Sequence, residues 1–204
     1  MDLHSVEMEL KKRLEYPYRW GRKQSDTWDG ATNFIYQTYD FETLLRKTEN
    51  MEQKLKDYAL NRWYNFWSAM AVENIFASHN NVTANKNSFD KLVDFTINGI
   101  PFDHKTSVFP KGFNKSFEYA RKNKKQLIQW LYNNQSQQGR KHFKNRLFII
   151  VYDKIGEHWK MKSEIMLLKR HIDFYLENFN ENKLTSLKFN NEKIYSDILW
   201  ITNI

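Results

Sequence analysis

The stretch that decides the fold is Lys91-Leu92-Val93-Asp94-Phe95-Thr96-Ile97-Asn98-Gly99-Ile100-Pro101-Phe102-Asp103-His104-Lys105-Thr106-Ser107. Two runs of alternating apolar and polar residues flank Asn98-Gly99, a dipeptide typical of a two-residue type I′ turn. The sequence therefore predicts a β-hairpin in which Ile97 pairs with Ile100. Counting outward from that pair places Phe95 opposite Phe102.

The same count gathers charged side chains on the polar face of the hairpin. Asp94 is expected directly opposite Asp103, and Lys105 lies two residues further on, so it points to the same face as Asp103. Asp is depleted in strands, and opposed like charges destabilise a sheet by roughly 0.2–1 kcal/mol. Lys105 could partly relieve the repulsion. A bound Mg²⁺ would relieve it better, since it takes carboxylate, water and phosphate oxygens. The alternative is an ordinary solvated polar face.

The other face of the hairpin is apolar and fixes the register, because a slip of one residue would turn this face to water. We expect His104 on this face as a packed residue and not as a catalyst. The apolar residues are Phe89, Val93, Phe95, Ile97, Ile100, Phe102 and Val108.

Composition bounds the class of protein. The chain has 204 residues and no Cys, which excludes disulfides and thiolate zinc sites and fits a reducing, cytoplasmic location. The longest apolar run, Leu147 to Tyr152, is far shorter than the ~20 residues of a membrane span. A net charge of +8 suits a polyanionic partner. We expect a single domain, 1–204, with an N-terminal extension (1–50), a core (51–155) and a C-terminal part (156–204).

Helical periodicity is clearest between residues 51 and 77. Apolar residues recur there at spacings of three and four, and Glu73 lies on the same stripe. A carboxylate in that position must be paired, protonated or bound to a metal. An ion pair with Arg or Lys is an open alternative. The stripe comprises Ala59, Trp63, Phe66, Met70, Glu73 and Ala77.

The remaining pattern predicts an α/β class with a central mixed sheet flanked by helices. Residues 146–152 read as a buried strand, and residues 184–204 as two short strands around Asn190-Asn191. Further helices are expected at 5–15, 41–48, 116–134, with Ser116 as N-cap, and 160–180.

At this point the chain resembles the PD-(D/E)xK nuclease superfamily, which has the restriction-endonuclease-like fold. The resemblance covers roughly residues 60 to 152. The family's motif positions match Glu73 on the helix, Asp94 on the first strand, Asp103-His104-Lys105 on the second, and Gln126 or Gln129 on the next helix. The run from Asp103 and the Gln-rich helix are similar to RecB-like members. Val93 stands where the family usually has Pro, and its third core strand is not evident before Ser116.

The resemblance implies a Mg²⁺-dependent DNA nuclease, most simply an endonuclease, with Mn²⁺ as a substitute cation. Asp94, Asp103 and Glu73 would hold the cation. Lys105 would orient the attacking water, and Gln126 or Gln129 would position the nucleophile or a phosphate. Roles in restriction, defence, recombination or repair fit such an activity, and cutting both strands is compatible with a homodimer.

Basic and aromatic residues outside this set are candidates for DNA backbone contacts, with a solvated charged face as the alternative. They are Arg19, Trp20, Arg22, Lys23, Lys122, Lys124 and Lys125. Two other functions stay open. One is a catalytically silent nucleic-acid-binding or assembly module on the same fold, and the other is an RNA-directed nuclease.

Overall fold

The computed structural model describes residues 1–20, 26–85, 92–134, 144–189 and 192–203. The chain divides into two compact units. The first comprises Met1–Asn74 with Lys162–Met166, and the second comprises Ile75–Met161 with Leu167–Ile204. The boundary between the two units lies inside the long helix, between Asn74 and Ile75. The predicted single domain with an extension over residues 1–50 stays a prediction.

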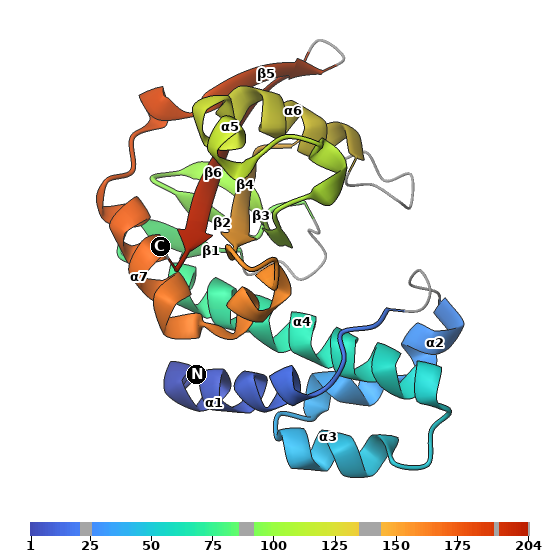
Figure 1. Cartoon of the computed structure of the whole chain (residues 1–204). Coiled ribbons are helices and arrows are strands. Elements are labelled where there is room, and N and C mark those ends of the chain that lie inside the picture. Colours follow the sequence, from blue (N-terminus) through green and yellow to red (C-terminus); the bar gives the residue numbers. More distant parts are fainter. Residues whose placement is uncertain (21–25, 86–91, 135–143, 190–191, 204) are drawn as a thin grey trace. The chain divides into compact units, whose positions relative to one another are not determined.

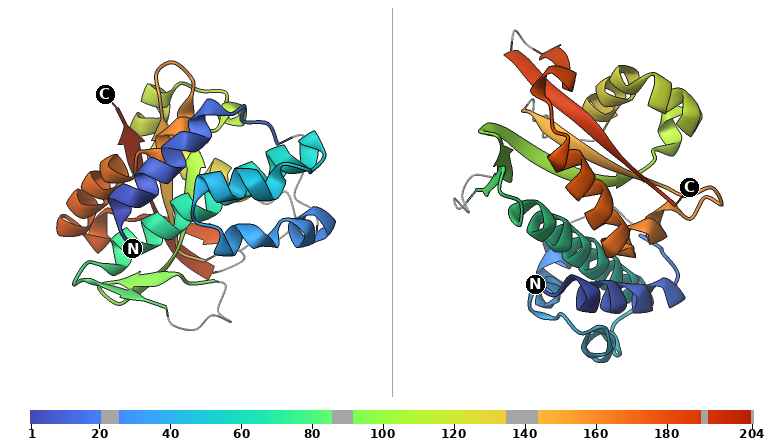
Figure 2. Two further views of the ribbon diagram at one scale, coloured as in Figure 1. Left: turned by 90° about the horizontal axis from the view of Figure 1, so that it is seen from below. Right: turned by 90° about the vertical axis from the view of Figure 1, so that its left-hand side faces the viewer.

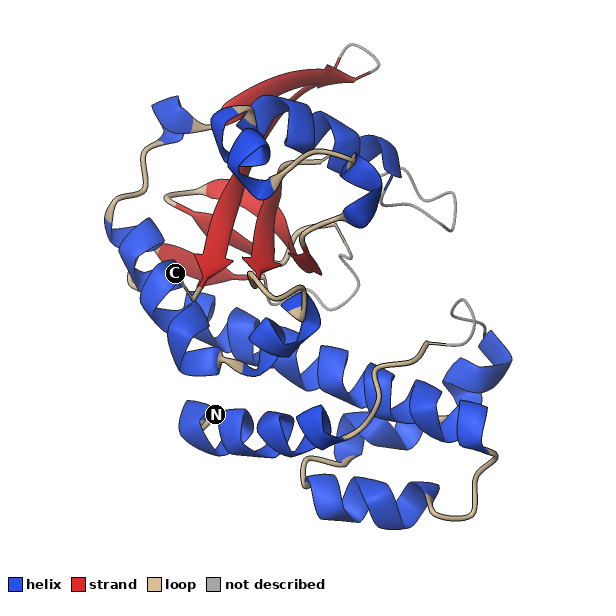
Figure 3. Cartoon of the chain, in the orientation of Figure 1, coloured by secondary structure: helices blue, strands red, loops and turns tan. Residues whose placement is uncertain are grey.

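The described part of the first unit consists of helices joined by loops and contains no strand (Figure 3). The carboxylates of Asp2 and Asp40 cap the first and third helices, accepting from the backbone N–H of His4 and Thr43. The helices predicted at 5–15, 41–48 and 51–77 are found within three residues at each end. The elements are α1 (Leu3–Lys12), α2 (Asp26–Ala31), α3 (Phe41–Thr48) and α4 (Gln53–Ala77), with short 3₁₀ turns at Arg13–Glu15 and Asn33–Gln37.

The second unit is built on one mixed sheet, which confirms the predicted fold class. Among the described residues the sheet has six strands in the order β1-β2-β3-β4-β6-β5 (Figure 1). β3, β4 and β6 are parallel, and the two edges add antiparallel pairs. The sequence does not predict β1. The strands are β1 (Val82–Ala84), β2 (Phe95–Ile97), β3 (Ile100–Val108), β4 (Arg146–Tyr152), β5 (Thr185–Phe189) and β6 (Glu192–Thr202).

The predicted hairpin forms with the predicted turn and register. Asn98 and Gly99 both have positive φ, 48° and 82°, as a type I′ turn requires, and Ile97 pairs with Ile100. Regular pairing ends at Phe95, however. Asp94 lies in a bend before β2, and its N–H donates to the carbonyl of Phe102 at 2.9 Å. The predicted ladder pair between Asp94 and Asp103 is therefore absent, because the strand turns away one residue earlier.

Two helices cover one face of the sheet, α5 (Phe117–Lys122) and α6 (Lys124–Asn134) (Figure 2, right). The sequence predicts a single helix here; it breaks at Asn123, whose N–H donates to the carbonyls of Tyr119 and Ala120. The Ser116 cap is confirmed by its hydrogen bond from Tyr119 N–H at 3.1 Å. The core on this face combines α5 and α6 with β4, β5 and β6. Its sheet residues are Phe148, Ile150, Leu187, Ile194 and Ile198.

The opposite face of the sheet is covered by α7 (Ile165–Glu177), which follows a 3₁₀ turn at His158–Ser163. Leu168, Ile172 and Leu176 of α7 are buried, as their spacing predicts.

The pairing of β3 with β4 determines on which face of the sheet each polar residue of β3 lies. Asp103 pairs with Arg146 and Lys105 pairs with Phe148, so Asp103 and Lys105 lie on the face that α6 covers.

The strand β6 is only partly flanked by β5, whose pairing ends at Ser196. From Asp197 onward this edge of β6 has no strand partner among the described residues. The Asp197 carboxylate accepts from the backbone N–H of Ile198 at 2.8 Å and from Lys124 Nζ at 2.6 Å.

None of the helices in the described part of the chain is long and apolar enough to cross a bilayer.

Candidate functional site

The first carboxylate of the candidate site, Asp94, is bound twice by His104. Its Oδ2 accepts from the backbone N–H and from the ring Nδ1 of His104, both at 2.7 Å. Burial acts to raise the pKa of Asp94, but these hydrogen bonds and the attraction of His104 outweigh it, so that the pKa lies below its ordinary value. Asp94 is therefore a carboxylate at neutral pH.

His104 lies on the apolar face, as the sequence predicts. Its side chain is 6% exposed, and its ring stacks on Phe95 with centroids 5.8 Å apart. Phe76 of α4 packs against both rings. The hydrogen bond from Nδ1 to Asp94 goes beyond the prediction, because His104 both packs in the core and fixes a site carboxylate.

The second carboxylate, Asp103, forms an ion pair with Arg146, the neighbouring residue on β4. Arg146 Nε donates to Asp103 Oδ2, and the two side chains are 14% and 20% exposed. Burial raises the pKa of Asp103 above its ordinary value. Arg146 opposes that rise, and the negative charge of Asp94 adds to it. The two carboxylates are therefore close enough to repel one another, as the hairpin predicts.

Lys105 completes the charged group on this face of β3. It is exposed, yet partial desolvation of its ammonium lowers its pKa; repulsion from Arg146 lowers it further, and Asp103 opposes the change. The cation that binds Asp103 directly is thus Arg146 and not Lys105. Arg146 is not among the residues predicted for the site. Its one signal in the sequence is a charge at the first position of a strand that is otherwise apolar.

The chemistry of this group suits a hard divalent cation. Two carboxylates from neighbouring segments are the oxygen ligands that Mg²⁺ takes, together with water and phosphate. The Oδ2 atom of Asp94 accepts from His104, and the Oδ2 atom of Asp103 accepts from Arg146. Arg146 competes electrostatically with any cation at Asp103.

Three other residues are predicted for catalysis, Glu73, Gln126 and Gln129. Glu73 is on α4, in the first unit, and its part in the site stays a prediction. Gln126 and Gln129 are exposed on α6 and line a cavity of about 710 Å³ with Thr185 and Ser186 of β5. β5 lies three places from β3 in the sheet, which at about 4.8 Å per strand is roughly 14 Å. The structure does not bring these glutamines to Asp103.

The cavity beside Gln126 gathers three of the seven predicted DNA-contacting residues. Lys122, Lys124 and Lys125 line it, and Lys122 and Lys125 are exposed. Lys124 is held by Asp197 at 2.6 Å. The exposed Lys122 and Lys125 add positive charge to this face of the second unit, which suits a polyanion.

Two further members of that set, Arg19 and Trp20, lie in the first unit. Arg19 is exposed, whereas Trp20 packs edge-on against Tyr18 and Tyr58 at centroid distances of 6.2 and 5.8 Å. Trp20 is thus part of an aromatic cluster, which favours the structural interpretation for that residue. Arg22 and Lys23 lie outside the described residues.

No protein-family model, curated protein or solved structure matches this chain.

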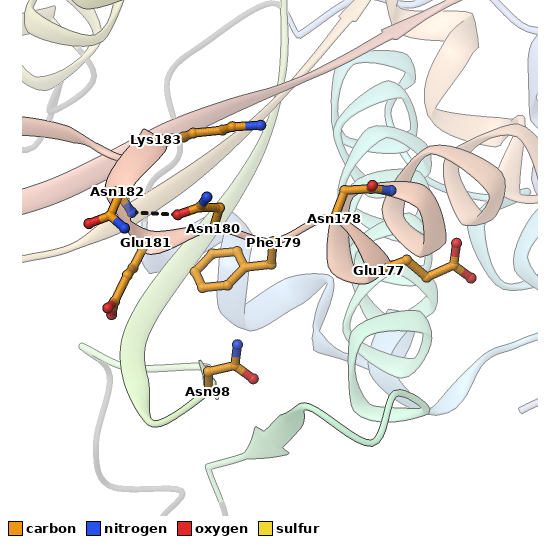
Figure 4. A pocket seen from close by; sticks show the side chains of 8 residues that line it. All are labelled: Asn98, Glu177, Asn178, Phe179, Asn180, Glu181, Asn182 and Lys183. Atoms are coloured by element: carbon orange, nitrogen blue, oxygen red, sulfur yellow. Dashed lines mark hydrogen bonds between the residues drawn. The ribbon is translucent and has the colours of Figure 1, made fainter.

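A further cavity, of about 430 Å³, lies where the hairpin turn meets the segment after α7 (Figure 4). Amide side chains dominate it, with Asn180 accepting from the N–H of Asn182 at 2.9 Å. None of the predicted catalytic residues lines this cavity. The lining residues are Asn98, Glu177, Asn178, Phe179, Asn180, Glu181, Asn182 and Lys183.

Proposed function

We propose that the protein is a Mg²⁺-dependent nuclease that hydrolyses phosphodiester bonds of DNA. The observation that carries the proposal is the grouping of Asp94, Asp103 and Lys105 at the start of the parallel part of the sheet. This combination of two carboxylates and a lysine is also what the resemblance to the PD-(D/E)xK superfamily implies. Mn²⁺ is expected to replace Mg²⁺.

Asp94 and Asp103 would hold the cation, which when bound neutralises phosphate charge and lowers the pKa of water. Asp94 is prepared for this role, since His104 keeps it ionised and oriented. Lys105 Nζ would hydrogen-bond the attacking water beside Asp103. Its lowered pKa makes the neutral amine, which accepts a proton, more accessible than in an ordinary lysine.

Three further assignments rest on the sequence. Glu73 would complete the cation site, directly or through water. Gln126 and Gln129, with Lys122 and Lys125 around the same cavity, fit contacts to the DNA backbone better than contacts to the nucleophile. A cytoplasmic homodimer acting in defence, recombination or repair is compatible with the activity.

The test is a cleavage assay on linear, circular and single-stranded DNA and on RNA, with Mg²⁺, Mn²⁺ or EDTA. Asp94→Asn, Asp103→Asn and Lys105→Ala should each abolish cleavage. Matched controls are Asp173→Asn, a half-buried paired carboxylate on α7, and Lys188→Ala, an exposed lysine on β5, which should both stay active. Absence of cleavage of every substrate, or equal cleavage by all variants, would contradict the proposal.

One observation favours a second candidate, a nucleic-acid-binding module without catalysis. Both carboxylates already have internal partners, His104 for Asp94 and Arg146 for Asp103, so the group is stabilised without a metal. Such a module would bind DNA equally well in EDTA and in Mg²⁺, and would leave it intact. The same assay, read beside a binding titration, distinguishes the two functions.

A further inference from the structure

We propose that Arg146 is a phosphate-binding residue that Asp103 holds until a divalent cation binds this carboxylate. The inference rests on the proposed function, because it assigns a second role to the same site. It begins from the ion pair, in which Arg146 Nε donates to Asp103 Oδ2 while both side chains are mostly buried. Arg146 thus balances a charge that burial alone would leave costly.

A divalent cation would compete with Arg146 for the carboxylate of Asp103. Both are positive, and in a partly buried site their mutual repulsion is weakly screened. The effect of Arg146 on its neighbour Lys105, whose pKa it lowers, shows that its charge acts across this face. Binding of the cation at Asp103 therefore weakens the hold of this carboxylate on Arg146.

Two aromatic rings keep the released guanidinium near the site. Its central carbon lies 5.9 Å from the ring centroid of Tyr132 on α6 and 5.9 Å from that of Phe148 on β4. Phe148 is the strand neighbour of Lys105. A phosphodiester that reaches Asp103 and Lys105 therefore meets Arg146, whose planar fork of donors matches two phosphate oxygens.

The first test measures Mn²⁺ affinity by titration calorimetry or by the spin resonance of free Mn²⁺. Arg146→Met should bind Mn²⁺ more tightly than the wild type, on the order of tenfold, because a competing charge is gone. The control is Arg121→Met on α5, whose arginine also lies over a ring, that of Phe117, and which should bind as the wild type does. If Arg146→Met is unfolded at the assay temperature, Arg146→Lys replaces it, with a smaller gain because the ammonium keeps the charge but not the fork.

The second test measures binding of a fluorescent DNA duplex with and without Ca²⁺ at matched ionic strength, on samples whose duplex stays intact on a gel. Ca²⁺ should tighten binding by the wild type several-fold, and Arg146→Met should lose that gain although it binds the cation better. Equal Mn²⁺ affinity of wild type and Arg146→Met, or an equal gain with Ca²⁺, overturns the inference and leaves the proposed function standing. Failure of both proteins to bind Mn²⁺ overturns both.

Discussion

The carboxylate of Asp94 accepts the backbone N–H of His104, 2.7 Å away, at the point where β2 leaves β3. In a longer hairpin this N–H would donate to a carbonyl of the partner strand. The side chain of Asp94 therefore substitutes for one backbone acceptor and, through the His104 ring, fixes its own direction. A residue of the candidate site is thus also part of the sheet.

Asp94→Ala should destabilise the protein by about 1–3 kcal/mol, since it leaves the His104 N–H and ring without their acceptor. Asp94→Asn keeps an acceptor oxygen and should cost less. Urea unfolding at pH 7 measures both. A cost below about 0.5 kcal/mol for Asp94→Ala would show that water replaces the carboxylate.

The pH dependence of that cost follows from the pKa of Asp94, which lies below its ordinary value of 3.8. A carboxyl group whose pKa is lower in the folded state than in the unfolded state stabilises the folded protein at pH values above the unfolded pKa. This stabilisation is lost as the pH falls through the folded pKa. The stability difference between wild type and Asp94→Asn should therefore be full above about pH 5 and should shrink below pH 3.8. A difference that stays constant down to about pH 3 would contradict the assignment.

Lys105 should act in the opposite direction, since its pKa lies below 10.5. The Lys105 side chain binds its proton more tightly in the unfolded chain than in the folded one, so the protonated form destabilises the folded state at neutral pH. The unfolding free energy should therefore increase as the pH rises from the folded pKa towards 10.5. Lys105→Met should raise the unfolding free energy at pH 7, by less than about 1 kcal/mol because Lys105 is exposed. The control variant Lys188→Met should leave the unfolding free energy unchanged. The stabilisation by Lys105→Met should shrink as the pH rises, so a stabilisation that grows with pH would contradict the prediction.

The ion pair between Asp103 and Arg146 should show strong coupling in a double-mutant cycle. Asp103→Leu or Arg146→Met alone leaves a mostly buried charge without its partner and should cost about 2–4 kcal/mol. The double variant should recover most of that loss, because it removes both charges together. Additive costs in denaturant unfolding would mean that the pair contributes little.

The turn can be tested separately from the charges. Gly99 has φ +82°, and no other atom lies within 4 Å of the place that an alanine methyl would take, so Gly99→Ala meets strain and not a clash. The expected cost is about 1–2 kcal/mol. Gly30→Ala on α2 is the control, since its surroundings are equally open and its backbone carries no positive φ. It should be neutral or slightly stabilising in thermal unfolding.

Local chemistry explains what could be predicted from the sequence. The turn at Asn98-Gly99 sets its own dihedral angles, and the apolar run at 146–152 is typical of a buried strand, so the hairpin and β4 are found where expected. The turn also brings the segments that carry Asp94 and Asp103 together, although the predicted ladder pair between them is absent. The strand β1 is only three residues long and leaves no periodic signal in the sequence.

The remaining features depend on contacts between distant residues. Arg146 meets Asp103 because β4 runs parallel to β3 in one particular register, which no local pattern encodes. The break at Asn123 is equally hidden, since Phe117, Ala120, Leu127 and Leu131 continue an apolar stripe whether or not the helix is interrupted. The sequence thus predicts the two carboxylates but not the residues that bind them, His104 and Arg146.

The Asp197 carboxylate has a consequence for the behaviour of the protein in concentrated solution. An edge strand with unpaired N–H and C=O groups is a template for pairing with another chain. By binding the N–H of Ile198, and by placing a nearly buried charge beside it, Asp197 obstructs a foreign strand at the first free position of β6. A single carboxylate, itself paired with Lys124, thus occupies the backbone donor that a foreign strand would need here.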